Sequence, residues 1–198
     1  MPGEDPAPVS VRLATKADVP ALTELIAASV EQLQAGDYSE LQRRGAIGSV
    51  FGVDPILIED QTYFLAVRDS EICGCGGWSR RATPFGTDHS PARDDSMLDP
   101  RQHAARIRAL FVHPAYARMG VGSAILKACE AAAKLAGFQR AELTATLTGV
   151  KLFRVHGFVP AEELQIALKN GEMLPVVRMT KALELSDDPA HQAGNSGQ

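Results

Sequence analysis

The sequence has few of the features that mark membrane, secreted or nucleic-acid-binding proteins. No stretch approaches the ~20 apolar residues of a membrane-spanning helix. Three cysteines are too few for a disulfide framework, and the first residues lack the basic segment and apolar run of a signal peptide. With a net charge of −4 and a pI near 5.7, the chain lacks the basic surface that polyphosphate binding needs. We therefore expect a cytoplasmic protein that binds neither membrane nor nucleic acid.

The composition is that of one globular domain. The 198 residues are 45% hydrophobic and 22% charged, which provides enough apolar side chains for a core. Three prolines in residues 1–8 predict a flexible arm, and the polar residues 184–198 predict a disordered tail. Residues 79–104 are rich in proline and charge and predict a long loop insertion. A single domain is therefore expected over residues 9–183.

Hydrophobic periodicity predicts an α/β fold. Residues 62–67 and 72–78 read as a β-hairpin. Further strands are expected at residues 9–13, 106–112, 140–146, 158–159 and 175–179. Helices are expected after the N-cap Asp18, within 38–50, from 120 to a stop at Gly137, and over 149–155. This order predicts a mixed, mostly antiparallel central sheet that is flanked by helices.

The helix expected from residue 120 has an apolar stripe, and one strand before it carries two cysteines. At helical spacing, one face should carry Val121, Ile125, Ala128, Ala132 and Leu135. Cys73 and Cys75 are two residues apart in the expected hairpin, so we expect both side chains on the same face of the sheet.

One motif carries specific chemistry. The strand 106–112 ends at Pro114, a short loop with Arg118 follows, and then Gly120 and Gly122 open a helix. The start of a helix presents unpaired N–H groups and the positive end of the helix dipole, so it can bind a pyrophosphate. Glycines let the backbone approach the phosphate oxygens, and an arginine adds a charge-assisted hydrogen bond. The motif thus predicts a phosphate-binding loop; the alternative is a tight turn that binds nothing.

This context resembles the GCN5-related N-acetyltransferase (GNAT) family. The family signature is Gln/Arg-x-x-Gly-x-Gly/Ala after a strand that ends in Val-x-Pro. Val112-His113-Pro114 and Gly120-Val121-Gly122 match it, whereas Ala117 departs from the usual Gln/Arg. The resemblance extends downstream to residues 148–158 and 174–181.

The resemblance implies an acyl-CoA N-acyltransferase fold, acetyl-CoA as co-substrate and no metal. It implies that two central strands splay apart around the pantetheine arm, and that a primary amine of a small molecule attacks the thioester directly. The residues that it implies for cofactor binding are Phe111, Val112, Arg118, Met119, Gly120, Val121, Gly122, Ser123, Thr148 and Phe153.

The general acid and base of the family do not carry over. Phe153 replaces the tyrosine that protonates the leaving thiolate in many relatives, and Arg108 stands where some relatives have a glutamate base. An arginine cannot accept a proton at neutral pH. Tyr38, in the region that shapes the acceptor pocket in relatives, and His103, whose imidazole titrates near neutrality, are the candidate catalytic residues. The alternatives are a partly buried surface tyrosine and a solvated loop histidine.

Other functions stay open. The cysteines permit a covalent acyl-enzyme route, although buried cysteines usually act as small apolar residues. A non-catalytic acyl-CoA-binding sensor and a protein N-acetyltransferase are the alternatives to an enzyme that acts on small amines. The sequence also leaves a homodimer open.

Overall fold

The computed structural model describes residues 8–83 and 94–183. The arm expected at residues 1–8, except residue 8 itself, the tail at 184–198 and the centre of the long loop lie outside the described residues. The described strands are β1 (Ser10–Leu13), β2 (Tyr63–Arg68), β3 (Glu71–Ser79), β4 (Ala105–Val112), β5 (Arg140–Thr146), β6 (Val159–Ala167) and β7 (Met173–Ala182). The described helices are α1 (Val19–Leu33), α2 (Glu40–Ala46), α3 (Pro55–Glu59), α4 (Val121–Leu135) and α5 (Val150–Val155), with short 3₁₀ turns at Lys16–Asp18, Pro114–Tyr116 and Leu147–Gly149.

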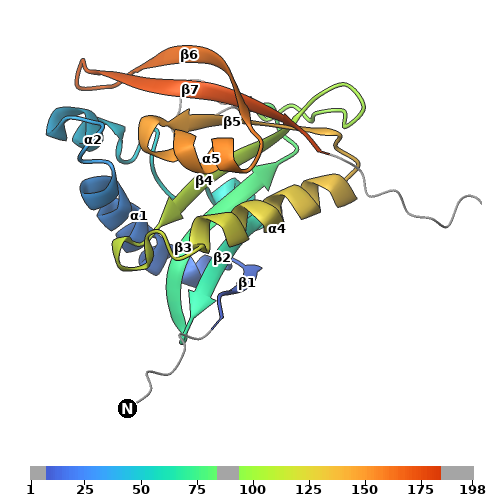
Figure 1. Cartoon of the computed structure of the whole chain (residues 1–198), viewed down its shortest axis with the longest axis horizontal. Coiled ribbons are helices and arrows are strands. Elements are labelled where there is room, and N and C mark those ends of the chain that lie inside the picture. Colours follow the sequence, from blue (N-terminus) through green and yellow to red (C-terminus); the bar gives the residue numbers. More distant parts are fainter. Residues whose placement is uncertain (1–7, 84–93, 184–198) are drawn as a thin grey trace, which may run out of the picture.

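The strands form one sheet in the order β1-β2-β3-β4-β5-β7-β6 (Figure 1). Every neighbouring pair is antiparallel except β4 and β5, which are parallel. The predicted mixed, mostly antiparallel sheet and its hairpin are confirmed. Helix α3 was not predicted, and β6 continues well beyond the expected Val159.

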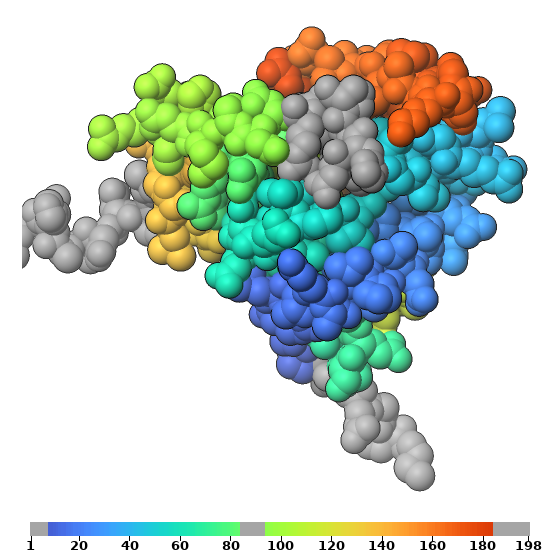
Figure 2. Space-filling view, turned by 180° about the vertical axis from the view of Figure 1, so that it is seen from behind, coloured from blue at the N-terminus to red at the C-terminus, as the bar shows by residue number. Residues whose placement is uncertain are grey.

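Helices cover both faces of the sheet. One core cluster packs α1 and α3 against the sheet through residues such as Leu22, Val30 and Leu57. The other packs α4 against the opposite face through Val121 and Ile125. Figure 2 shows the first face, where the blue and cyan segments, which include α1, α2 and α3, form the surface and the orange β6–β7 hairpin lies beside them. This three-layer arrangement buries the apolar side chains of both helix layers.

Hydrogen bonds connect α2 to the β6–β7 hairpin. The Gln42 side chain donates to the carbonyl of Met173 at 2.8 Å, and the Asn170 side chain donates to the carbonyl of Leu41 at 2.8 Å. These contacts hold the helical layer next to the last two strands.

The buried face of α4 matches the expected one only in part. Val121 and Ile125 are buried and Ala128 and Ala132 are half-buried. Ala133 is buried instead of Leu135, which is 90% exposed. Leu135 follows Ala133 by two positions, which places it almost on the opposite side of a helix with 3.6 residues per turn. The stop at Gly137 is confirmed by its positive φ of 89°.

The two cysteines of β3 lie on opposite faces of the sheet, so the expectation of a shared face was wrong. The register between β2 and β3 shifts between the pairs Ala66↔Gly74 and Val67↔Ile72, which leaves Cys73 as an extra residue. Such a bulge reverses the alternation of side chains. Cys73 therefore packs in the core beneath α4, and Cys75 in the core beneath α1.

Candidate cofactor groove and acceptor pocket

The first turn of α4 has the geometry of an anion site. Gly120, its N-cap residue, has a φ of 83° and provides no side-chain cap. The positive φ favours glycine, and the first backbone N–H groups of a helix have no acceptor within the helix. At Gly122 the constraint is packing, because a Cβ there would lie 3.0 Å from the Leu152 side chain and would press on it. These backbone donors are oriented for a ligand rather than capped by the chain.

A groove of about 590 Å³ opens over this turn. Two cationic side chains, Arg118 and Lys151, line it, and its opposite wall includes Ser29 and Leu33 from α1. The predicted cofactor residues that line this groove are Phe111, Val112, Arg118, Gly120, Val121, Gly122, Ser123 and Thr148. Cations beside a helix N-terminus complement a phosphate-bearing ligand.

The groove lies where β4 and β5 separate. Their pairing runs from Ala105↔Ala141 only to Ile107↔Leu143, although β4 continues to Val112. Further along β4, Ala109 has a positive φ of 51°, and the register with β3 shifts by one residue. The strands thus part at a backbone irregularity. Such bulges redirect backbone groups next to functional sites.

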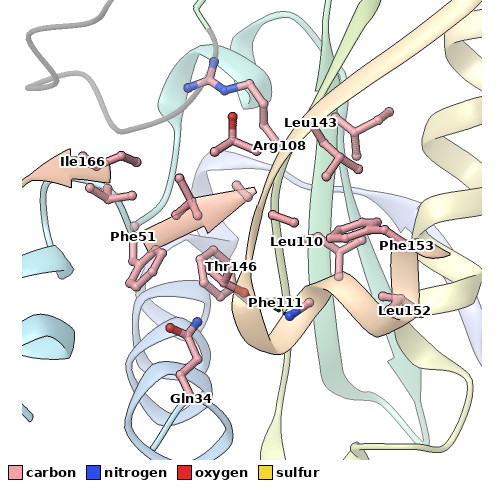
Figure 3. A pocket seen from close by; sticks show the side chains of 18 residues that line it. Gln34, Phe51, Arg108, Leu110, Phe111, Leu143, Thr146, Leu152, Phe153 and Ile166 are labelled. Carbon is pink, nitrogen blue, oxygen red and sulfur yellow. Dashed lines mark hydrogen bonds between the residues drawn. The ribbon is translucent and has the colours of Figure 1, made fainter. Parts of the chain in front are cut away.

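A second, smaller pocket of about 110 Å³ continues from the groove (Figure 3). Its lining is mostly apolar and comes from β4, β5, the segment 50–52 and the last two strands. The residues that line both hollows are Gln34, Leu110, Phe111, Thr146, Gly149 and Leu152. A molecule that lies along the groove can therefore reach the small pocket at this junction.

Arg108 lines one part of the small pocket and belongs to a buried ion pair. The Arg108 guanidinium lies 2.8 Å from the Asp54 carboxylate, and the two side chains are 5% and 2% exposed. Asp54 also caps α3 by accepting from the Ile56 N–H at 3.1 Å. The position that carries a base in some relatives therefore holds a cation whose charge is balanced by a carboxylate.

Gln34 ends α1 at the junction of the two hollows (Figure 3). Its side chain is buried, with the residue only 4% exposed, and its Oε1 atom has no hydrogen-bond partner among the described residues. Buried side-chain oxygens are normally paired. The other polar side chain at the junction, Thr146, accepts a hydrogen bond from the Gly149 N–H at 3.2 Å.

The structure places Tyr38 in a structural position. Its hydroxyl donates to the Pro175 carbonyl at 2.7 Å and accepts from the Leu147 N–H at 2.8 Å. The residue is 3% exposed and lines neither hollow, and burial raises its pKa to about 12. A phenol with both roles occupied and a raised pKa is a poor proton acceptor near neutrality. The geometry does not favour the catalytic role that was expected for it.

His103 lies at the wrong end of its strand for catalysis. It precedes β4, whereas the groove and the small pocket open along the later part of that strand. Its Nδ1 atom accepts from the Asp99 N–H at 3.1 Å, and it borders a separate hollow with Arg140 and Thr180. Since parallel strands present their carboxyl ends at one edge, a residue before β4 belongs to the opposite edge.

Three of the residues that were expected to bind the cofactor differ from that expectation in their position or in their contacts. Met119 lines neither hollow, and its sulfur accepts from Arg68 at 3.9 Å. Phe153 lines the small pocket rather than the groove. Thr148 lines the groove, but its hydroxyl donates to the Asp37 carboxylate at 2.6 Å.

The two cysteines of β3 are buried away from the groove and the small pocket. Both β3 thiols are buried, and burial raises the pKa of Cys73 and raises that of Cys75 to about 12. Neither lines the groove or the small pocket. Because the thiolate is the nucleophilic form, these positions do not favour a covalent acyl-cysteine route.

The sequence analysis did not predict several of the residues that line the groove and the small pocket. Gln34 is the clearest example. It continues the i, i+4 series of Leu22, Ile26 and Val30, which forms the buried stripe of α1. A polar residue in a buried apolar stripe is a detectable signal. Lys151 and Thr146 carry no comparable signal in the sequence.

The matched family agrees with this geometry. The family model described as Acetyltransferase (GNAT) family matches residues 26–158. The chain belongs to the acetyltransferase (GNAT) family. The predicted family, fold class and N-acetyltransferase activity are thereby confirmed. A search of curated proteins gave no match.

Solved structures similar to this acetyltransferase share its fold. A GCN5-related N-acetyltransferase from Rhodopseudomonas palustris is 23% identical, with a TM-score of 0.68 over 91% of this chain and 99% of that one. PaiA N-acetyltransferase from Thermoplasma acidophilum, in complex with coenzyme A, is 16% identical, with a TM-score of 0.60 over 88% and 99%. YncA from Salmonella typhimurium, with acetyl-CoA, is 18% identical, with a TM-score of 0.61 over 91% and 97%.

Within residues 8–83 and 94–183 of the acetyltransferase, no helix is long and apolar enough to cross a membrane. The same ranges contain no group of three or more His, Cys, Asp or Glu side chains that are placed to hold a metal ion.

Proposed function

We propose that this protein transfers the acetyl group of acetyl-CoA to a primary amine of a small molecule, by direct attack within a ternary complex. The observation that supports this most is the continuity of three features. An uncapped helix start, the separation of β4 from β5, and a small apolar pocket follow one another along a single path. The proposed setting is the cytoplasm, in line with three unpaired, buried cysteines.

The cofactor path follows from the lining residues. The backbone N–H groups at Val121 and Gly122, with Arg118 and Lys151, would hold the pyrophosphate. The part of β4 after Ile107 has no partner in β5, so its backbone is available to pair with the amides of the pantetheine arm as a strand would. This arrangement brings the thioester to the junction with the small pocket.

In the proposed reaction the amine nitrogen attacks the thioester carbonyl carbon. A C–N bond forms, the C–S bond breaks, CoA leaves as a thiolate, and the nitrogen loses its proton to water. A backbone N–H near Phe111, beyond the bulge at Ala109, would stabilise the developing oxyanion. A thiol has a pKa of about 8.5, so the thiolate leaves without a dedicated acid. The phenylalanine at position 153 is compatible with this chemistry.

Ligand-dependent thermal stability tests the cofactor assignment. A ligand that binds only the native state at 100 times its Kd stabilises it by about 2.7 kcal/mol. Acetyl-CoA should therefore raise the Tm, and a matched concentration of adenosine should not. The absence of a shift at millimolar acetyl-CoA would contradict the proposal.

Release of free thiol in the presence of an amine panel tests turnover. Initial rates at varied concentrations of both substrates should give intersecting double-reciprocal lines, because both substrates bind before the product leaves. Parallel lines would indicate a covalent intermediate. Binding without thiol release would indicate a sensor, and acetylated proteins in co-expression mass spectrometry would indicate a protein substrate.

A further inference from the structure

We infer that the Gln34 side chain binds the acceptor amine, and that the acceptor is a small amine with an uncharged, apolar body. This inference rests on the proposed function, since it places the acceptor beside the thioester. It also concerns a residue outside the phosphate-binding motif that identified the family.

The position of Gln34 is fixed by the backbone around it. Its carbonyl accepts from the N–H groups of Asp37, at 3.1 Å, and Tyr38, at 3.0 Å. Tyr38 is in turn held by Leu147 and Pro175. The carboxamide is therefore presented at the junction by a backbone that is tied to the ends of β5 and β7.

The state of the carboxamide points to a ligand. Its Oε1 atom is buried and has no partner among the described residues. An unpaired buried oxygen destabilises a fold relative to an apolar group of the same shape. The oxygen as placed is out of reach of solvent, but the residue lines both hollows, so a turn of the carboxamide would bring the oxygen to an N–H group of a bound molecule.

Two molecules at this junction carry N–H donors: the acceptor amine and the pantetheine arm. The unpaired part of β4 can meet the pantetheine amides, as argued above. Gln34 also lines the small pocket beyond the junction, where Phe51 and Ile166 lie (Figure 3). The amine is the donor that enters this pocket.

The small pocket selects by size and charge. Its volume is about 110 Å³, below the ~150 Å³ of an engineered cavity that binds benzene. Arg108 is the one charged residue of its described lining, and the Asp54 carboxylate lies 2.8 Å from its guanidinium and opposes that charge. The remaining side chains are apolar or carry hydroxyl and amide groups. A compact aliphatic amine such as isobutylamine fits these limits, whereas spermidine has too much charge and tryptamine is too large.

The test compares Gln34→Leu with the wild-type protein and with Gln42→Leu. In the Gln34 variant, kcat/KM for isobutylamine should fall about three- to tenfold, the usual worth of one hydrogen bond. The Kd of CoA should stay within about twofold, and the Tm should be unchanged or higher, because an unpaired oxygen is removed. Gln42, which hydrogen-bonds Met173 and Ser39, is a structural glutamine; its variant should lose Tm and keep its kcat/KM for the amine.

Each other result overturns the inference. Weaker CoA binding by Gln34→Leu would assign the hydrogen bond to pantetheine, and a lower Tm would assign Gln34 a structural role. Unchanged kcat/KM would remove Gln34 from the acceptor site, and wild-type turnover of spermidine or tryptamine in preference to isobutylamine would overturn the substrate class. Failure of the wild-type protein to bind CoA or to release thiol with any amine would instead refute the proposed function, on which the inference rests.

Discussion

The backbone N–H of Leu147 donates a 2.8 Å hydrogen bond to the hydroxyl of Tyr38, 109 positions earlier in the chain. The same hydroxyl donates to the carbonyl of Pro175 at 2.7 Å. One phenol thus connects the end of α1, the end of β5 and β7. These contacts set the distance between α1 and the sheet, where Gln34 faces the groove.

Replacing Tyr38 with phenylalanine should therefore lower the stability of the fold rather than the rate of the reaction. The substitution leaves two partly buried backbone groups with one fewer partner, at a cost of about 1–3 kcal/mol in the free energy of unfolding. Urea denaturation measures this loss. Tyr116→Phe, which removes an exposed hydrogen bond to Glu71, is the matched control with a smaller effect. A fall in kcat of more than about a hundredfold in Tyr38→Phe, the range of general acid–base effects, would restore a catalytic role.

Gly120→Ala should weaken both the fold and cofactor binding. With φ at 83°, a Cβ at Gly120 costs about 1–2 kcal/mol, as left-handed backbone does for other residues. If the backbone relaxes this strain, the N–H groups of the residues after Gly120 would also change direction. Gly171→Ala provides the control, because Gly171 has a φ of 87° and open space around it in the β6–β7 turn.

Calorimetry of CoA binding distinguishes these two glycines. Both variants should lose similar stability, but only Gly120→Ala should show a raised Kd for CoA. Equal CoA affinities in the two variants would contradict the phosphate-binding role of the α4 start.

Removing one partner of the Arg108–Asp54 pair should destabilise the protein more than removing both partners. Asp54→Ala leaves the buried guanidinium with one fewer partner and should cost about 3–5 kcal/mol. The double variant Asp54→Leu, Arg108→Met should recover much of that loss, because neither charge of the pair remains. The exposed pair Arg44–Glu40 is the control: Arg44→Ala should cost no more than about 0.5 kcal/mol. Additive losses in the double variant would show that the two side chains act independently.

Stability should fall as the pH drops below about 6.5, the ordinary pKa of histidine, because of His156. Burial lowers its pKa in the folded protein. Below the pKa of the unfolded chain, the unfolded state binds the proton more readily, so protonation favours unfolding. Above that pH both states are neutral and the contribution vanishes. Chemical denaturation of the wild type and His156→Gln at pH 8, 6.5 and 5 measures the difference.

Ser123→Ala is the control for this pH effect. Ser123 contacts the His156 ring at 2.8 Å, but burial is the largest cause of the lowered pKa. The serine variant should therefore keep the pH dependence, whereas the His156→Gln protein should lose part of it. A pH dependence that is identical in all three proteins would contradict this account.

Local sequence signals predicted most of the elements and the glycine-containing turn before α4, because each of these depends on a few neighbouring residues. Gly120 needs a positive φ, and Gly137 ends α4, as glycines at such positions do. The face of α4 was misjudged, since two stripes of small apolar residues overlap in it. Only packing against β3 decides that Ala133 is buried and that Leu135 is exposed.

The acceptor side was less predictable, because it is assembled from distant segments. His103 and Tyr38 were selected by their chemistry, but their neighbours are set by strand direction and by long-range hydrogen bonds. The bulge at Cys73 likewise has no local sequence mark. Gln34 did carry a signal, as a polar residue within a buried apolar stripe, and such positions are worth weighing together with the charged ones.

The short parallel pairing of β4 and β5 has a mechanical consequence. Strands β1–β4 on one side and β5–β7 on the other meet through three residue pairs, Ala105↔Ala141, Arg106↔Glu142 and Ile107↔Leu143. The sheet therefore consists of two parts that are joined by these three residue pairs. Helix α4 and the residues near Tyr38 connect the two parts further. A molecule bound between the separated ends of β4 and β5 would contact both parts of the sheet, so we expect ligand binding to make the domain more rigid.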